Sequence, residues 1–143
     1  MVDQSAVGRA FTPVTARVEP GRLRFFLKTL GETNPVYHEG EAAPVPPTYL
    51  FCLEMMDATD GLEFLTALDI DLARVLHGEQ RFDYHAPVVV GDTLTFHPRV
   101  SSVTDKKGGA MTLIVVDTPV TNQNGVHVAD VSRTIVVRNA RPS

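Results

Sequence analysis

Apolar residues recur at helical spacing early in the chain. Between Pro20 and Gly31, four of them fall at positions i, i+3, i+4 and i+7: Leu23, Phe26, Leu27 and Leu30. Proline suits the first turn of a helix, and glycine suits the position just past its end. The pattern therefore predicts a helix from about Pro20 to Leu30, and FTPVTARV before it is a short strand or an extended lead-in.

A second apolar segment follows a run of prolines. Pro44, Pro46 and Pro47 exclude a helix up to that point, and Pro47 or Thr48 can begin one. Residues 49–58 then predict a helix that is apolar on nearly all sides, which is typical of a helix buried on most sides. The sequence LEFLTALDIDLARVL after it favours a short helix leading into a strand.

The second half of the chain changes to a period of two. EQRFDYHAPV and TLTFHPRVSSV each alternate apolar with polar residues, and a Gly-Asp turn lies between them. TDKKGG and TNQNGV predict hairpin loops, and Asn124-Gly125 is a strong signal for a tight turn. AMTLIVVDTPVTN and VHVADVSRTIVVR are the strands on either side of that turn. We expect at least four antiparallel strands, of which the last three form a meander.

This order of elements indicates a fold. A helix, an irregular loop, a long buried helix and then antiparallel strands predict an α+β hot-dog fold, in which a curved antiparallel sheet wraps a long central helix. Such a sheet leaves an edge strand and one flank of the helix uncovered. We therefore expect a dimer, either a homodimer or a heterodimer that forms a double hot dog.

Composition narrows the classes of function. The 143 residues fit one domain over 1–143, with 43% apolar and 21% charged residues, close to the average of globular proteins. The net charge is -4 and no basic cluster occurs, which argues against a nucleic-acid partner. A single cysteine, Cys52, excludes a disulfide within the chain. The lack of a signal-peptide core and of any long apolar run predicts a soluble cytoplasmic domain without a membrane partner.

One stretch, LGETNPVYHEGEAA, gathers polar side chains of several kinds. Glu32, Asn34, Tyr37 and His38 place a carboxylate, an amide, a phenol and an imidazole close together. Such a group can form an active site, because proton transfer requires positioned acids and bases. It can equally form the polar turn that closes a helix, with asparagine and proline in turn positions. The residues alone leave both interpretations open.

GETNPVYHEGEAA resembles the signature of the hydratase-2 or MaoC-like enzymes, Ser-Gly-Asp-x-Asn-Pro-Leu-His followed by an acidic or small residue and an alanine. HGEQRFDYHAPVVVGDTLTFHPRV is similar to that family's strand, proline, Gly-Asp turn and strand. The similarity continues through TNQNGVHVADVSRTIVVR and spans residues from Phe11 to Arg138. In detail the chain resembles the N-terminal domain of MaoC-like dehydratases, the FAS1-like dehydratases.

The resemblance implies a hot-dog fold and (3R)-hydroxyacyl/enoyl chemistry on a thioester of coenzyme A or acyl carrier protein, with no metal or redox cofactor. In the family an aspartate and a histidine act together on the water and the α-proton, and an asparagine orients them. The asparagine is retained as Asn34, the aspartate falls on Glu32, and the histidine falls on Tyr37, with His38 next to it. These four are the implied catalytic residues, altered at both acid–base positions.

The family also implies a substrate site at the start of the central helix, where a backbone N–H receives the thioester oxygen. Here that segment reads VPPTY, and its prolines have no N–H to donate. Pro47, Thr48 and Tyr49 are the implied substrate-binding residues, together with His77. Histidines in the strand segments are expected at the surface or in structural roles: His85, His97 and His127. No His/Cys/Asp spacing predicts a zinc site.

Four functions remain open. The chain can be a (3R)-hydroxyacyl-thioester dehydratase or trans-2-enoyl-CoA hydratase that acts as a homodimer, through Glu32 with His38 or Tyr37. It can be the substrate-binding half of a heterodimer whose partner carries the intact aspartate and histidine. It can be a non-catalytic acyl-CoA-binding module. The least favoured function is a hot-dog thioesterase, for which Glu54 on the central helix would be the base.

Overall fold

The computed structural model describes residues 2–140; Met1 and residues 141–143 of the expected domain lie outside the described part. The first half contains β1 (Val14–Arg17), α1 (Pro20–Leu30), α2 (Tyr49–Asp57) and α3 (Glu63–Ala67). The second half contains β2 (Val75–Tyr84), β3 (Thr93–Phe96), β4 (Arg99–Lys106), β5 (Met111–Thr121) and β6 (His127–Arg138). Short 3₁₀ turns lie at Gln4–Ala6, Pro35–Tyr37, Leu72–Arg74 and Lys107–Gly109.

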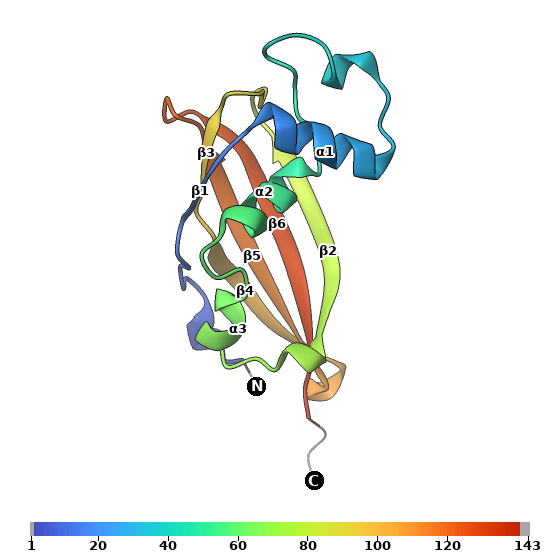
Figure 1. Ribbon diagram of the computed structural model, residues 1–143. Helices are drawn as coiled ribbons and strands as arrows, with labels where there is room; N and C mark the ends of the chain where they lie inside the picture. The colour runs from blue at the N-terminus through green and yellow to red at the C-terminus, as the bar shows by residue number, and fades with distance from the viewer. Residues whose placement is uncertain (1, 141–143) are drawn as a thin grey trace.

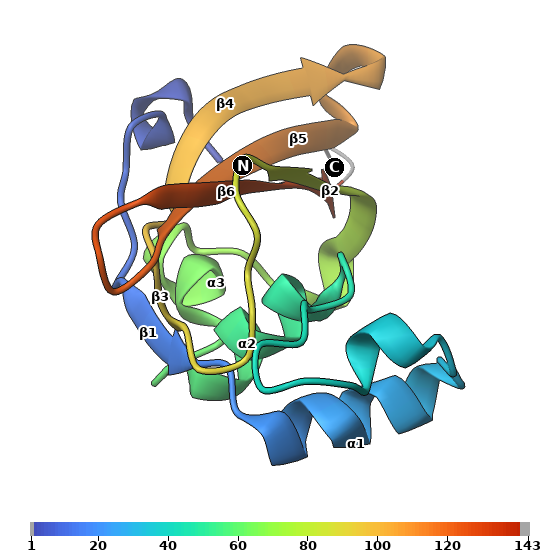
Figure 2. The same ribbon diagram turned by 90° about the horizontal axis from the view of Figure 1, so that it is seen from above.

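The strands form one antiparallel sheet in the order β1-β3-β5-β6-β2, and β4 also pairs with β5. The sheet curves around α2 and α3, while α1 lies farther out, beyond α2 (Figures 1 and 2). This arrangement confirms the predicted α+β hot-dog fold. Among residues 2–140, β2 pairs only with β6 and is therefore an edge strand. Within the same residues no helix has the length and apolar character needed to cross a bilayer.

α1 begins and ends at the predicted residues. Pro20 occupies its first turn, and Gly31 follows its last residue with a φ of 68°, where its N–H bonds to carbonyls of the last turn. This left-handed backbone is costly for residues with a Cβ, which explains the glycine. Leu23 and Leu27 are buried in the core, whereas Leu30 is exposed, so only part of the predicted apolar face is covered.

α2 has nine residues, begins at the predicted Tyr49 and ends at Asp57, one residue before the predicted end at Ala58. One side is buried as expected, since Leu50 and Leu53 have no exposed surface. The opposite side is open: Met56 is 49% exposed, and Phe51 and Cys52 are partly exposed. The prediction of burial on nearly all sides is wrong because the sheet and α1 cover only the sides of α2 that face them. An apolar helix face is left open.

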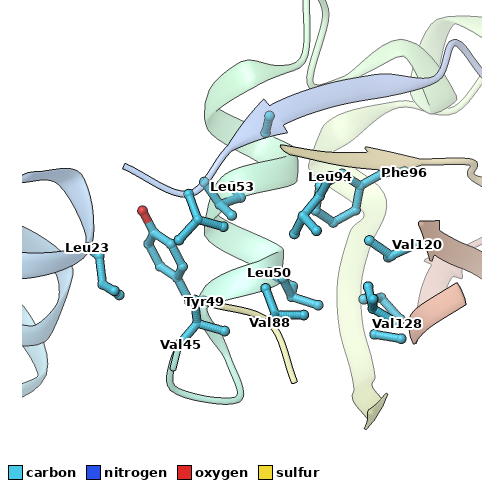
Figure 3. Close-up of a cluster of buried hydrophobic side chains, with 14 of the residues drawn as sticks. Leu23, Val45, Tyr49, Leu50, Leu53, Val88, Leu94, Phe96, Val120 and Val128 are labelled. Carbon is cyan, nitrogen blue, oxygen red and sulfur yellow. The ribbon is translucent and has the colours of Figure 1, made fainter. Parts of the chain in front are cut away.

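The main core lies between α1, α2 and the sheet. Leu23 from α1, Leu53 from α2 and Phe96 from β3 belong to it (Figure 3). A second cluster lies under α3, where Phe64 and Leu65 join apolar residues of β4, β5 and β6. Each large side chain removed from water contributes roughly 1.5–3 kcal/mol. These two clusters therefore fix the helices on the sheet.

Two strands differ from their predicted bounds. β2 begins at Val75, before the predicted start at Glu79. The segment predicted as one strand over residues 93–103 is divided into β3 and β4 at His97-Pro98. Pro98 cannot donate a ladder hydrogen bond, and β3 and β4 pair with β5 on either side of it. The two predicted hairpins, β4–β5 and β5–β6, are confirmed.

Candidate functional site

Three hollows follow one another around the loop between α1 and α2. The first, of about 330 Å³, lies between α1 and the loop and is lined by Tyr37 and His38. The second, of about 490 Å³, lies between the loop and the connection from β2 to β3, and Tyr37 and Pro47 line it. The third, of about 790 Å³, lies between α2 and β2 and includes Thr48 and His77. We call this third hollow the α2–β2 groove.

Glu32, Asn34 and His38 are held in hydrogen bonds of the loop itself. The Glu32 carboxylate accepts from the Asn34 N–H at 2.8 Å, and the Asn34 side-chain oxygen accepts from the Val36 N–H at 3.1 Å. The Nε2 atom of His38 lies 2.9 Å from the Glu32 carbonyl oxygen. Because a carbonyl oxygen can only accept, this Nε2 carries the proton. These contacts are typical of a turn that follows a helix.

The predicted catalytic residues are thus close together without forming an acid–base pair. Within residues 2–140, the Glu32 carboxylate and the His38 ring share no hydrogen bond, because the His38 contact is to the Glu32 backbone. Tyr37 is half-buried, packs against the main core and borders two hollows. His38 is exposed and borders one of them. Of this group, Tyr37 and His38 are therefore the side chains placed to meet a ligand.

The α2–β2 groove is the most apolar of the three hollows. Its walls are aromatic and sulfur-containing side chains from α1, α2 and β2: Phe26, Phe51, Cys52, Met55, Met56 and Phe82. Thr48, His77 and Gln80 are its polar members. Burial raises the pKa of the Cys52 thiol, although Arg22 acts in the opposite direction. Cys52 is therefore an apolar wall residue rather than a thiolate nucleophile, and the groove can hold an apolar chain.

Tyr49, which was predicted to bind substrate, belongs to the core instead. Its side chain has no exposed surface and points from α2 toward Leu23 of α1 (Figure 3), with its ring centroid 5.0 Å from that of Phe26. Burial raises the pKa of its phenol. Its N–H donates to the Pro46 carbonyl oxygen at 3.0 Å. The Thr48 N–H, just before α2, has no hydrogen-bond partner within residues 2–140 and is one of the donors left free at the start of the helix.

Glu54 faces β6 rather than the α2–β2 groove. The side chain is 4% exposed, and its Oε1 lies 3.7 Å from the Arg133 Nη2. Together with Arg133 and Phe64 it lines a separate cavity of only about 30 Å³. Burial raises the pKa of the Glu54 carboxyl, and Arg133 opposes this shift. A base for thioester hydrolysis would have to reach the acyl group, and Glu54 does not line the groove.

Sequence reasoning missed two features. The Tyr84 hydroxyl donates to the Pro47 carbonyl oxygen at 2.6 Å beside the second hollow, and burial raises the pKa of this phenol. On the outer face of the sheet, His85 and His127 both hydrogen-bond to Asp130, at 2.7 and 2.8 Å, although no metal site was predicted. Neither feature has a local signal in the sequence, because each joins segments that are far apart in the chain: Tyr84 with Pro47, and His85 with Asp130.

Comparison with known proteins identifies the family. Residues 5–131 match the family described as FAS1-like, dehydratase domain region. A UPF0336 protein of Streptomyces coelicolor is 34% identical over 149 residues, with 97% of each chain covered. The C-terminally truncated HadBC (3R-hydroxyacyl-ACP dehydratase) complex of Mycobacterium tuberculosis superposes with a TM-score of 0.75 at 22% identity, covering 91% of this chain and 96% of that chain. A MaoC-like dehydratase of Rhodospirillum rubrum superposes with a TM-score of 0.68 at 21% identity. The superposition covers 96% of this chain and 95% of that chain.

The two solved structures agree with this chain in fold, and their low identities support no more than that. The family match extends over most of the chain and includes both the NPVYH segment and the Gly-Asp turn on which the resemblance rests. The chain therefore belongs to the FAS1-like dehydratase domain family.

Proposed function

We propose that this chain is the acyl-binding subunit of a (3R)-hydroxyacyl-thioester dehydratase, or trans-2-enoyl hydratase, whose partner chain supplies the catalytic aspartate and histidine. The substrate is a thioester of coenzyme A or acyl carrier protein. The observation that carries the proposal is the α2–β2 groove, an apolar hollow of about 790 Å³. This volume lies within the range that small-molecule sites occupy. The reaction needs no redox cofactor, because water is added across a double bond or removed from it.

The edge strand supports the need for a partner. β2 pairs with β6, and its other edge has no strand beside it among the described residues. The unpaired backbone groups of an edge strand readily bind a further strand. Leu76 and Met56 are exposed apolar residues on β2 and α2, and the same partner would cover them. A second hot dog paired along β2 would extend the sheet and close the groove. The similar HadBC protein is itself a complex.

The loop after α1 supports assigning the acid–base chemistry to the partner. The Glu32 carboxylate accepts from a backbone N–H, and the His38 ring donates to a backbone carbonyl. Neither residue lines the α2–β2 groove, and Tyr37 does not line it either. Thr48 does line it, and its N–H lies at the positive end of α2. We assign this N–H as the donor to the thioester oxygen, where negative charge develops.

A homodimer that catalyses the reaction itself is the second candidate. Tyr37 and His38 border the first hollow, so a substrate lying over the loop would meet an imidazole. His38 would then have to leave the Glu32 carbonyl oxygen and act through its ring. A thioesterase is not favoured, because Glu54 faces Arg133 outside the groove. A non-catalytic acyl-CoA-binding module differs from the main proposal only in lacking a catalytic partner.

Hydration of crotonyl-CoA, followed by loss of the enoyl absorbance, tests the main proposal. We expect no turnover by the chain alone, and turnover when it is mixed with a hot-dog chain that carries the intact Asp and His signature. Turnover by the chain alone would contradict the proposal and favour the homodimer. Release of free thiol without hydration would indicate a thioesterase. Binding of acyl-CoA without turnover in any mixture would indicate the binding module.

A pair of matched variants tests the groove. We expect Phe51→Asp to lower kcat/KM of the complex by at least about tenfold, since a charge placed in an apolar groove costs more than about 1.4 kcal/mol. Phe25→Asp is the control, because Phe25 is 70% exposed and does not line the groove. Equal losses in the two variants would exclude the groove as the acyl site.

A further inference from the structure

His85, His127 and Asp130 bring metal-ligand atoms together on the outer face of the sheet. The Nε2 atoms of His85 and His127 lie 2.7 and 2.8 Å from the two carboxylate oxygens of Asp130. One ligand atom from each residue lies within 4.8 Å of the other two. The centroids of the two imidazole rings are 4.7 Å apart. Both Nε2 atoms therefore converge on one carboxylate, from segments that are far apart in the sequence.

A bulge in β6 places two of these side chains on the same face. In a regular strand, residues three apart point to opposite faces. Residues 120–121 of β5 pair with Ala129 and His127, so Val128 is an extra residue on β6. Val128 and Ala129 are both fully buried, so the alternation of inward and outward side chains along β6 shifts by one residue. Asp130 therefore points to the same outer face of the sheet as His127. Bulges commonly redirect side chains in this way next to functional sites.

The same bulge anchors His85. The N–H groups of His85 and Ala86 donate to the Val128 carbonyl oxygen at 2.8 and 3.2 Å. The chain leaving β2 is therefore docked on the residue that creates the bulge. Backbone hydrogen bonds, and not side-chain contacts alone, bring His85 beside His127.

We propose that His85, His127 and Asp130 bind a single divalent transition cation of the zinc class. Two imidazoles and a carboxylate are ligands that zinc accepts, and three protein ligands leave a fourth position for water or an external ligand. In the metal-free chain the Nε2 atoms face the Asp130 carboxylate as hydrogen-bond partners. In the complex each neutral ring carries its proton on Nδ1 and presents the Nε2 lone pair to the cation.

The spacing suits such a cation after a small adjustment. Metal–ligand bonds of about 2.1 Å in a tetrahedron place ligand atoms about 3.4 Å apart. The side chains of His85, His127 and Asp130 are 45%, 50% and 40% exposed, so they can separate from 2.7–2.8 Å without disturbing the core. Asp83, which is bound to Arg81, pairs with Asp130 across the β2–β6 ladder and adds a second carboxylate to the same face. Arg81 offsets the charge of Asp83, so Asp130 is the carboxylate that attracts a cation.

A bound cation would connect the end of β2 to β6. His85 also lines the second hollow with Ala86 and Pro87, so the cation would hold one wall of that hollow against the sheet.

Titration of the full chain with Zn²⁺, followed by calorimetry and by NMR of the histidine ring nitrogens, tests the proposal. We expect one zinc per chain and shifts at the His85 and His127 Nε2 atoms, with the His97 ring unchanged. Asp130→Asn and His85→Ala should each weaken zinc binding by at least about tenfold, the smallest loss typical when even an outer partner of a metal ligand is replaced. His97→Ala, which removes an exposed histidine outside the cluster, should bind zinc like the unaltered chain.

Circular dichroism of each variant without metal shows whether it is folded. The ring shifts are read on the unaltered chain, so the proposal remains testable if a variant does not fold. Absence of zinc binding by the unaltered chain would overturn it. Equal affinity in the folded His85→Ala variant, or shifts confined to other histidines, would mark adventitious binding and would overturn it as well.

Discussion

Gly31 and Asn34 determine the course of the loop that carries Tyr37 and His38. Gly31 ends α1 with a φ of 68°, and the Asn34 side chain caps the short turn at Pro35–Tyr37. Both residues act on the backbone within a few positions of themselves. Because Tyr37 and His38 follow directly, the backbone conformations at Gly31 and Asn34 determine which hollows the Tyr37 and His38 side chains border.

Replacing Gly31 should cost stability through backbone strain alone. We expect Gly31→Ala to lower the free energy of unfolding by about 1 kcal/mol, because a Cβ disfavours left-handed backbone, whereas nothing lies within 4 Å of where it would be placed. Gly21→Ala is the matched control, since that site is equally open and its φ is not positive. It should be neutral or stabilise by about 0.5 kcal/mol, as for alanine at a compatible site. Urea denaturation measures both, and equal effects would contradict the strain.

The loop was predictable from sequence in its backbone but not in the orientation of its side chains. Gly31, Asn34 and Pro35 are the residue types that a helix end and a turn favour, and each has the predicted role. The direction of the His38 ring could not be predicted from the sequence. The ring contacts the Glu32 carbonyl oxygen at 2.9 Å, and the two groups meet only in the folded loop. The sequence therefore identifies the segment and leaves the state of its side chains undetermined.

At the scale of elements, α2 separates the core under the sheet from the α2–β2 groove. Its buried side carries Leu50 and Leu53 into the core, and its open side forms one wall of the α2–β2 groove. Polar contacts hold it along its length: the Tyr84 hydroxyl donates to the Pro47 carbonyl oxygen at its start, and Glu54 faces Arg133 of β6. At its end, Asp57 forms an ion pair with Arg22 of α1 at 2.7 Å. The Glu54 contact is buried, so its contribution depends on pH.

Arg133→Met should destabilise the chain more at neutral than at acid pH. Burial raises the pKa of Glu54 in the folded chain, and Arg133 offsets part of that shift. A carboxyl whose folded pKa is raised stabilises the fold below its unfolded pKa, and this stability is lost as pH rises through the folded pKa. Without Arg133 the folded pKa rises further. We expect a loss on the order of 3 kcal/mol at about pH 7.5 and a smaller loss at about pH 5.

The double variant Glu54→Leu/Arg133→Met is the control for this prediction. It removes both charges, so much of the lost stability should return at neutral pH, because apolar replacements of a buried pair are often neutral. Thermal unfolding at the two pH values measures the effect. A loss in Arg133→Met that does not change with pH would show that packing over the Phe64 ring, and not the buried carboxylate, accounts for it.

Elements were predicted best where the signal is local. The bounds of α1 and the two hairpins follow from proline, glycine and turn residues that act within a few positions. The open face of α2 was missed because a pattern of apolar residues predicts burial in the same way whether those residues face a core or a groove. The cluster of His85, His127 and Asp130 was missed because it depends on an extra residue at Val128, and no periodic pattern marks a bulge.

At the scale of the whole molecule, the chain is a single hot dog with one side uncovered. Its core is complete under the sheet, whereas one edge of β2 and the open face of α2 are uncovered among residues 2–140. The same region contains the largest of the hollows around the α1–α2 loop. The proposed division of labour follows: this chain holds the acyl group, and the partner performs the proton transfers.

The hydration rate of the complex under two replacements tests this division most directly. Glu32→Gln in this chain retains an oxygen that can accept from the Asn34 N–H, so we expect the loop to persist and the rate to stay unchanged. Replacing the partner's aspartate should lower the rate by about 10²–10⁴-fold, the usual contribution of a positioned acid or base. A rate that is lost with Glu32→Gln and kept when the partner's aspartate is replaced would contradict the division.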